Sequence, residues 1–187
     1  PDVYIGASDY PGNVGLLYHQ KAPRLFERMD LSDYFEHNRS HGVAVADFDR
    51  DGDLDMVVGH SRMRCDGAMG ADCHPDQQVY LYENQMGTGS NWLQLRLVGG
   101  AASNRAAIGA RVEVKVGDVR QTQLVDGGHG HFGAQRDLTL HFGVGAGCEA
   151  RVRVWWPDSG WTLEQIDAVP ANARYLVEQG NGLRVAP

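Results

Sequence analysis

The sequence predicts an all-β protein, and three features of the chain support this prediction. Short segments that alternate apolar and polar residues recur along the chain, which is the pattern of strands with one buried face. Several of these segments are rich in β-branched residues, which favour strands. The 187 residues include 24 glycines, a content that suits a β protein with many turns. No run of about 18 apolar residues occurs, so the sequence predicts no transmembrane segment.

An acidic loop between two short strands dominates the first part of the chain. Residues 46–58 read ADFDRDGDLDMVV, and the β-branched segments 43–45 and 56–58 predict the flanking strands. Carboxylates this close raise one another's pKa and repel, unless a cation lies between them. Calcium takes six to eight oxygen ligands and fits such a loop. The sequence therefore predicts calcium as cofactor and five metal-site residues: Asp47, Asp49, Asp51, Asp53 and Asp55.

The spacing of this loop differs from that of an EF-hand. An EF-hand needs a glutamate at loop position 12 and a helix on each side, whereas position 12 here is Val58. We expect Asp53 to offer its backbone carbonyl and Gly52 to adopt a positive φ. The expected side-chain ligands are Asp47, Asp49, Asp51 and Asp55. The alternative interpretation is an acidic surface turn without a metal.

The start of the chain is similar to the segment that follows the acidic loop. Residues 1–6 (PDVYIG) align with residues 54–59 (LDMVVG), and residues 16–18 (LLY) align with residues 80–82 (YLY). We interpret this as the second half of one repeat followed by a nearly complete repeat, the alternative being chance similarity between short strands. In the connector between the copies, four apolar residues are predicted to pack, the alternative being a ligand cage: Leu25, Phe26, Tyr34 and Phe35.

From residue 91 onward, alternating segments follow one another at regular spacing. They predict six or seven short strands and hence a small β-sandwich or barrel. One two-residue turn, at Gly117 and Asp118, predicts a hairpin. With a boundary near Gly89, the chain divides into residues 1–88, a repeat region with the calcium loop, and residues 89–187, a β domain.

The cysteines and the net charge limit the cellular setting. Cys65 and Cys73 bracket a short loop and predict a disulfide, with two free thiols as the alternative; Cys148 is left without a partner. A disulfide and a calcium loop both favour a secreted, extracellular or periplasmic protein. The net charge of −7 argues against nucleic acid as a partner.

Further clusters are weaker candidates for sites, and core or surface roles are the alternatives. A transition-metal site, with zinc or copper, would use His129 and His131, joined by His141 or Asp126. A second cluster would contain His60, His74 and Asp72. A sugar-stacking platform would use Trp155, Trp156, Trp161 and Tyr175, although strand alternation turns one of the two adjacent tryptophans inward. No catalytic motif occurs, so no enzyme activity is expected.

Two families match these motifs. GVAVADFDRDGDLDMVV (residues 42–58), followed by LYEN (81–84), resembles the FG-GAP/VCBS-type repeat of calcium-binding β-propellers. The ordered series NWL (91–93), SNR (103–105), GAR (109–111), HFG (141–143) and WP (156–157) resembles the ASPIC/UnbV domain of a cartilage acidic protein-like family. Two departures are that fewer than two propeller blades are present, and that residues 128–133 (GHGHFG) replace a Ser/Gln-rich turn.

The resemblance implies partial β-propeller-type blades, structural calcium, an extracellular or periplasmic location and no established catalysis. We therefore predict a calcium-binding structural or adhesion module that mediates protein–protein assembly. Its partners would be other protein chains or copies of itself, joined by strand addition at exposed sheet edges. The alternative function is a carbohydrate-binding module that contacts a glycan through the tryptophan-rich face.

Overall fold

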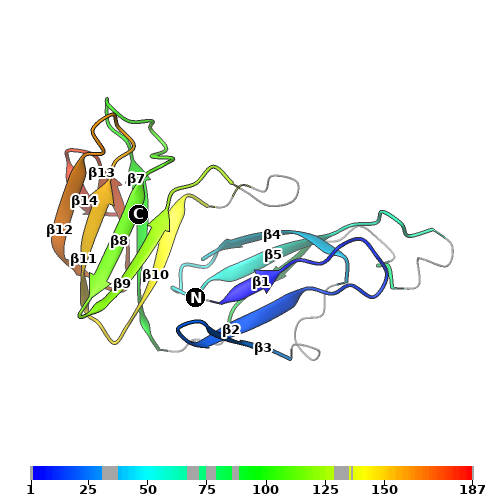
Figure 1. Cartoon of the computed structure of the whole chain (residues 1–187). Helices are drawn as coiled ribbons and strands as arrows, with labels where there is room; N and C mark the ends of the chain where they lie inside the picture. The colour runs from blue at the N-terminus through cyan, green and yellow to red at the C-terminus, as the bar shows by residue number, and fades with distance from the viewer. Residues whose placement is uncertain are drawn as a thin grey trace. The chain divides into compact units, whose positions relative to one another are not determined.

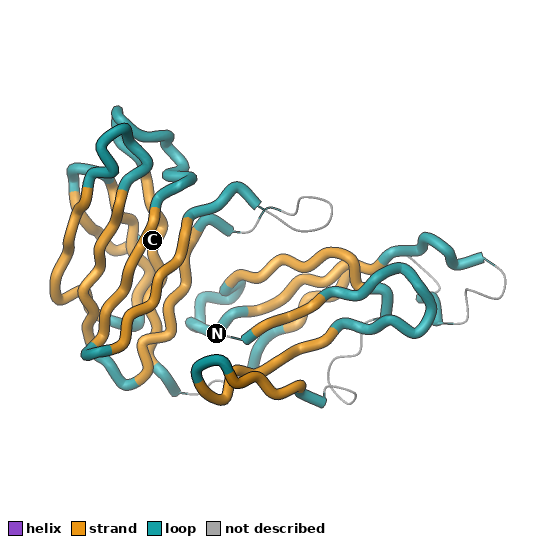
Figure 2. The backbone as a smooth tube through the Cα atoms, viewed as in Figure 1, coloured by secondary structure: helices purple, strands orange, loops and turns teal. Residues whose placement is uncertain are grey.

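The computed structural model describes residues 2–30, 38–66, 72–74, 79–85, 89–128, 135 and 137–186, and it confirms the all-β class. Strands and turns account for these residues, with no helix among them (Figure 2). The strands are β1 (Val3–Ile5), β2 (Leu16–Ala22), β3 (Leu25–Arg28), β4 (Ser40–Ala46), β5 (Asp55–His60), β6 (Val79–Tyr82), β7 (Asn91–Val98), β8 (Arg111–Val116), β9 (Val119–Leu124), β10 (Thr139–Gly145), β11 (Glu149–Trp155), β12 (Leu163–Pro170), β13 (Ala173–Glu178) and β14 (Gly182–Val185).

The chain forms two compact units. The first unit contains the described residues up to Ala46 and those within Asp55–Glu83. The second contains Asp47–Leu54, Asn84–Gly128 and the described residues from Gln135 onward. The acidic loop therefore groups with the C-terminal strands, although the strands β4 and β5 that it connects belong to the first unit.

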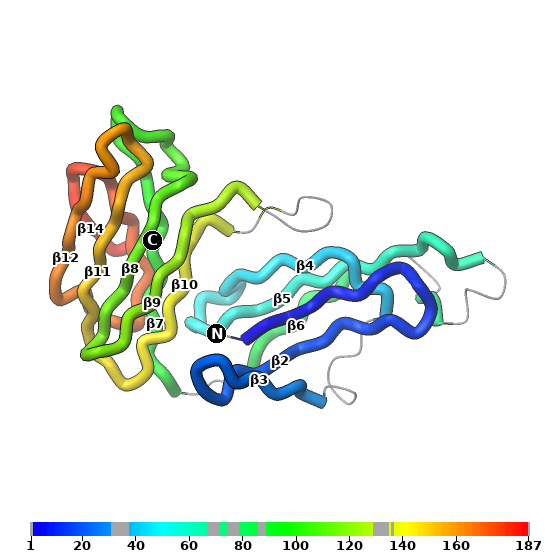
Figure 3. Tube along the Cα trace, in the orientation of Figure 1, coloured from blue at the N-terminus to red at the C-terminus, as the bar shows by residue number. Residues whose placement is uncertain are grey.

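Two antiparallel three-stranded sheets, β1-β2-β3 and β4-β5-β6, make up the first unit, and their chain order can be followed in Figure 3. Val3 pairs with Tyr18 in one sheet, and Met56 pairs with Tyr82 in the other. In the alignment of the two copies, Val3 corresponds to Met56 and Tyr18 corresponds to Tyr82. The next two pairs of each sheet correspond in the same way. The shared register supports the internal repeat. Neither sheet is closed, and the propeller-type blade stays a prediction.

Few apolar side chains are buried in the first unit. Among the described residues, Val58 is its one fully buried hydrophobic side chain. Leu25 and Phe26 on β3 are 59% and 42% exposed, so the prediction that they pack is wrong. The other two residues of that prediction, Tyr34 and Phe35, lie outside the described residues. Their segment forms a strand that pairs with β2 and turns both side chains toward solvent.

The second unit contains two open four-stranded sheets around one apolar core (Figure 1). One sheet has the order β10-β7-β13-β14, with β13 parallel to β7, and the other has the order β12-β11-β8-β9. Alternate residues of β7, β8, β10, β11 and β13 face the core, as period-2 alternation requires. Examples are Leu93 and Leu95 on β7, Val112 and Val114 on β8, and Val152 and Val154 on β11. Because neither sheet closes on itself, this arrangement is the predicted sandwich rather than a barrel.

One strand of this sandwich was not predicted from the sequence. The two-residue hairpin turn at Gly117 is present, since Val116 pairs with Val119. The segment that forms β12, however, has no clean alternation of apolar residues. It is an edge strand with mostly exposed side chains, its pairing with β11 is irregular between Ala150 and Val152, and its Ala168 has a φ of 54°.

Candidate metal centre

The acidic loop is shaped by its own aspartates and by one glycine. Gly52 has a φ of 98°, as predicted, and is buried. The backbone N–H of Asp51 donates to Asp49 Oδ1 at 3.1 Å, and that of Asp53 donates to Asp51 Oδ1 at 2.8 Å. Such contacts between an aspartate and the backbone two residues later are typical of tight turns. The alternating sequence thus folds the loop locally.

Three carboxylates of the β4–β5 hairpin lie close together. Asp47, Asp49 and Asp55 each offer an oxygen, and these oxygens all lie within 4.8 Å of one another. Asp55 begins β5 and is 2% exposed, Asp47 is half-buried and Asp49 is exposed. Asp51 and Asp53 belong to the same loop but lie outside this group of described residues.

The two oxygens of Asp47 have different surroundings. Oδ2 accepts hydrogen bonds from the Gln94 side chain (Nε2, 2.6 Å) and from the backbone N–H of Gly52 (3.2 Å). Oδ1 is buried and has no hydrogen-bond partner. A buried carboxylate oxygen without a partner is costly, since ionised groups need compensation when they leave water.

Side chains of β7 and β10 line the loop within the second unit. A Cβ atom on Gly52 would overlap the indole of Trp92, so the loop approaches this ring as closely as a glycine allows. The Trp92 and His141 rings stack, with centroids 6.3 Å apart. Burial lowers the pKa of His141, although the charges of Asp47 and Asp53 act in the opposite direction.

The donor set fits a hard divalent cation. All the grouped donors are carboxylate oxygens, the ligand type that calcium prefers. Like charges within 4.8 Å repel one another, and a cation between them removes that repulsion. The bare Oδ1 of Asp47 supplies an acceptor that no hydrogen bond uses. The residues present therefore suit the predicted calcium, while the full set of five ligating aspartates stays a prediction.

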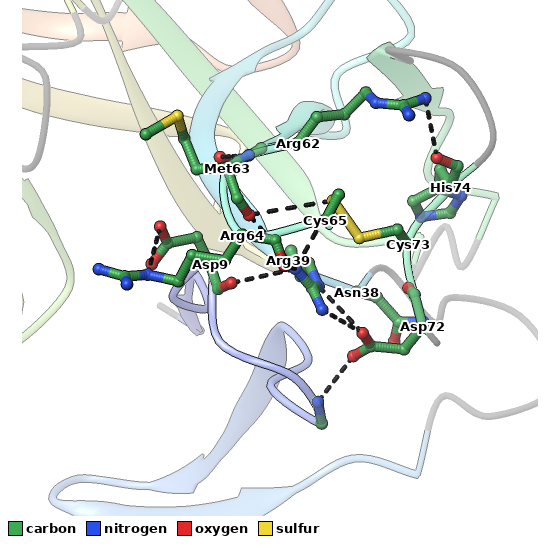
Figure 4. The surroundings of a disulfide bond; sticks show 12 residues. Asp9, Asn38, Arg39, Arg62, Met63, Arg64, Cys65, Asp72, Cys73 and His74 are labelled. Carbon is green, nitrogen blue, oxygen red and sulfur yellow. Dashed lines mark hydrogen bonds and ion pairs between the residues drawn. A yellow bond between two sulfur atoms is a disulfide. The ribbon is translucent and has the colours of Figure 1, made fainter. Parts of the chain in front are cut away.

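A second polar cluster surrounds the predicted disulfide, which joins Cys65 and Cys73 (Figure 4). Arg39, 1% exposed, donates from Nε to Asp72 Oδ1 at 3.0 Å and from Nη1 to the carbonyl of Asp9 at 3.2 Å. The same Nη1 lies 3.6 Å from Cys65 Sγ. Asp72 Oδ2 in turn accepts from the backbone N–H of Gly12 at 2.6 Å. The hydrogen bond from Arg39 is the main cause that lowers the pKa of Asp72.

The structure separates the members of the predicted histidine clusters. The rings of His60 and His74 lie 4.4 Å apart, but Asp72 is bound to Arg39. The prediction for His129 and His131 falls outside the described residues. His141 lies beside Trp92 in the wall of the acidic loop.

The predicted aromatic platform is not formed as a unit. Trp156 and Tyr175 are buried in the sandwich core, which places one of the two adjacent tryptophans inward as alternation predicted. Trp155 packs against the guanidinium of Arg111, 4.7 Å from its ring, and Trp161 is 57% exposed. The thiol of Cys148 is free and exposed.

Sequence reasoning missed Gln94 and Trp92 as neighbours of the loop. Both lie on the non-core register of β7, opposite Leu93 and Leu95. The signal was a glutamine and a tryptophan on the polar face of an otherwise apolar strand. Gln94 is nevertheless 4% exposed, so this strand is covered on both faces at that point.

The fold and the loop define an all-β module that joins an acidic hairpin loop to a two-sheet β domain. Residues 100–184 match the family model described as ASPIC and UnbV, which confirms this part of the resemblance. The chain is 30% identical to cartilage acidic protein 1 of Mus musculus over 153 residues, which are 80% of this chain and 21% of that protein. With cartilage acidic protein 1 of Homo sapiens it shares 30% identity over 138 residues, 72% of this chain and 18% of that protein.

The chain therefore spans about a fifth of the length of these relatives. The FG-GAP/VCBS-type repeat stays a prediction. No helix among the described residues is long and apolar enough to cross a membrane.

Proposed function

We propose that this chain is a calcium-binding structural module in which the acidic loop holds the ion. The observation that carries the proposal is the gathering of Asp47, Asp49 and Asp55, with one oxygen of Asp47 buried and unbonded. The ion would offset the negative charge and fix the ends of β4 and β5. Calcium would supply positive charge at this site, and the carboxylates of Asp47, Asp49 and Asp55 would hold it.

The proposed effect of calcium is stabilisation of the native state. An ion that binds the folded chain and not the unfolded chain adds about 2.7 kcal/mol at a hundred times its dissociation constant. Concentrations that support such a site are typical outside the cytoplasm. The disulfide between Cys65 and Cys73 agrees with that location, since disulfides persist in oxidising compartments.

Thermal unfolding with calcium, with magnesium or with chelator tests the proposal. Calcium should raise the midpoint above the value in chelator, and magnesium should do so less, because it requires a smaller octahedral site. Asp49→Ala should lose most of this gain. Its side chain is exposed and the change removes one exposed hydrogen bond within the loop, so the midpoint in chelator should fall only slightly. Asp118→Ala, which removes an exposed carboxylate at the β8–β9 turn, serves as the matched control. Equal midpoints of the wild type in calcium and chelator would refute the proposal.

The second part of the proposal is assembly with other protein chains through strand addition. β6 lies at the edge of its sheet, and its Val79 and Leu81 are 70% and 61% exposed. An apolar edge strand is a template for pairing with another chain, whereas a lysine on such an edge prevents pairing. Light scattering across micromolar concentrations should show a mass that rises with concentration and falls back in Leu81→Lys. A constant monomer mass would refute pairing between copies.

A further inference from the structure

We infer that Gln94 and Trp92 on β7 are positioning residues for the calcium loop, so that the calcium affinity of the loop depends on two side chains of the C-terminal sandwich. This inference rests on the proposed function. The inference goes beyond the proposed function because it assigns a role to two residues that are not ligands of the ion and that lie at least 40 positions from their contacts in the loop.

Gln94 fixes the orientation of the Asp47 carboxylate. Its Nε2 donates to Asp47 Oδ2 at 2.6 Å, and the Gly52 N–H donates to the same oxygen. With Oδ2 held by two donors, Oδ1 remains the oxygen available to a cation. Because Gln94 is 4% exposed and its Nε2 also lies 3.4 Å from Nδ1 of His141, its amide has little freedom to turn away.

Trp92 fixes the position of the loop backbone. Its indole packs against Gly52, where even a methyl group would overlap the ring, and it stacks with the ring of His141. Gly52 is thus required both for its φ of 98° and for the space beside the ring. A rigid wall at this point keeps the turn compact, which holds Asp47 and Asp49 on the same side of the loop.

Both contacts are of the kind that tunes metal sites from outside the ligand shell. Residues that hydrogen-bond to a metal ligand typically change metal affinity by about 10-fold to 100-fold when they are removed. Coupling between binding and structure is reciprocal, so bound calcium should also stabilise the contacts around Gln94.

The first test compares calcium affinities of full-length variants by isothermal titration calorimetry. Gln94→Met keeps the size of the side chain but lacks the donor, and it should bind calcium about 10-fold to 100-fold more weakly. Gln165→Met is the matched control, because Gln165 is exposed on β12 and contacts Arg153 and Asp167 instead. It should bind as the wild type does. Hydrogen exchange should show that calcium protects residues 47–54 less in Gln94→Met than in the wild type.

The second test uses terbium, which replaces calcium and emits when a nearby tryptophan transfers energy to it. At saturating terbium, Trp92→Phe should lose most of the tryptophan-sensitised emission, whereas Trp155→Phe should retain it. This measurement decides the matter if Gln94→Met does not fold. Wild-type affinity in Gln94→Met, or full emission in Trp92→Phe, would overturn the inference while leaving the proposed function intact. A wild-type chain that binds no calcium would refute the proposed function itself.

Discussion

The two units of this chain are stabilised in different ways. Of the 19 buried hydrophobic residues among those described, all but Val58 lie in the second unit, where they form one core between two sheets. The interior of the first unit instead contains polar groups, notably Arg39, Ser40 and Asp55. Ser40 accepts a hydrogen bond from Tyr4, and Arg39 is paired with Asp72 beside the disulfide.

This difference indicates that the first unit depends on interactions other than apolar burial for its stability. Burial of apolar surface supplies most of the favourable free energy of folding, and small domains with little of it rely on disulfides, metals or partners. The second unit is stabilised by burial of apolar surface. The first unit has a disulfide, an ion pair with a buried arginine, and the ends of the hairpin that leads into the acidic loop.

The largest expected effect comes from opening the sandwich core. Phe142 is fully buried, so Phe142→Ala should reduce the free energy of unfolding by about 3–5 kcal/mol. All four tryptophans lie in the second unit, so urea unfolding followed by tryptophan fluorescence reports on this change. The same substitution at Phe26, which is 42% exposed on β3 of the first unit, should cost far less when unfolding is followed by hydrogen exchange of that unit. Equal costs at the two positions would break the comparison between the units.

The next largest effect is expected at Arg39. Arg39→Met keeps much of the side-chain volume but removes one donor from Asp72 and one from each of several backbone carbonyls. Arg39 is 1% exposed and donates several hydrogen bonds. Hydrogen bonds of charged groups contribute about 1.5–3 kcal/mol each, so a cost of about 3 kcal/mol is expected here. Hydrogen exchange resolved by peptide should locate the loss in the first unit and leave the sandwich protected. Arg28→Met, an exposed arginine on β3, should change little; a loss of the same size there would contradict the assignment.

Removing the disulfide should have a somewhat smaller effect. Closing a loop of this length lowers the entropy of the unfolded chain enough to stabilise the fold by about 2.5 kcal/mol. Cys65→Ser combined with Cys73→Ser should therefore loosen the first unit in the same exchange measurement, because Asp72 would no longer be held beside Arg39. Cys148→Ser changes an exposed free thiol and should have no effect. Unchanged exchange in the double variant would show that the ion pair alone fixes this region.

The fold of the second unit was easier to predict than its contacts with the acidic loop. Alternation on β7 and β8 specifies which side chains face the core, because a register shift would expose all of them. By contrast, β12 is an edge strand with few buried residues, so no alternation marks it. The role of Arg39 was also missed, since its partner Asp72 is 33 residues away.

The acidic loop was recognisable because its aspartates are close in sequence, and the same limit explains what was missed around it. Gln94 reaches Asp47 over 47 residues. Only the fold brings two such positions together, and a single sequence contains no periodicity that reports a contact of this range.

The smallest expected effect distinguishes two positions that the repeat makes equivalent. Asp2 corresponds to Asp55 through the shared register of β1–β2 and β5–β6. Asp55 is buried and belongs to the carboxylate group. Asp2 is about half exposed, and its Oδ1 accepts hydrogen bonds from the backbone N–H of Gln20 at 2.9 Å and from the ring of His19 at 3.0 Å.

Because its hydrogen bonds are solvent-exposed, Asp2→Ala should cost about 1 kcal/mol or less. This cost should be the same in calcium and in chelator, since the carboxylate group does not include Asp2. Asp55→Ala should instead remove the calcium-dependent part of the thermal midpoint, because the ion would lose a buried ligand. Thermal unfolding of both variants in calcium and in chelator measures this difference. If Asp2→Ala also reduced the calcium response, Asp2 and Asp55 would share a role in calcium binding, which would contradict the difference in burial between them.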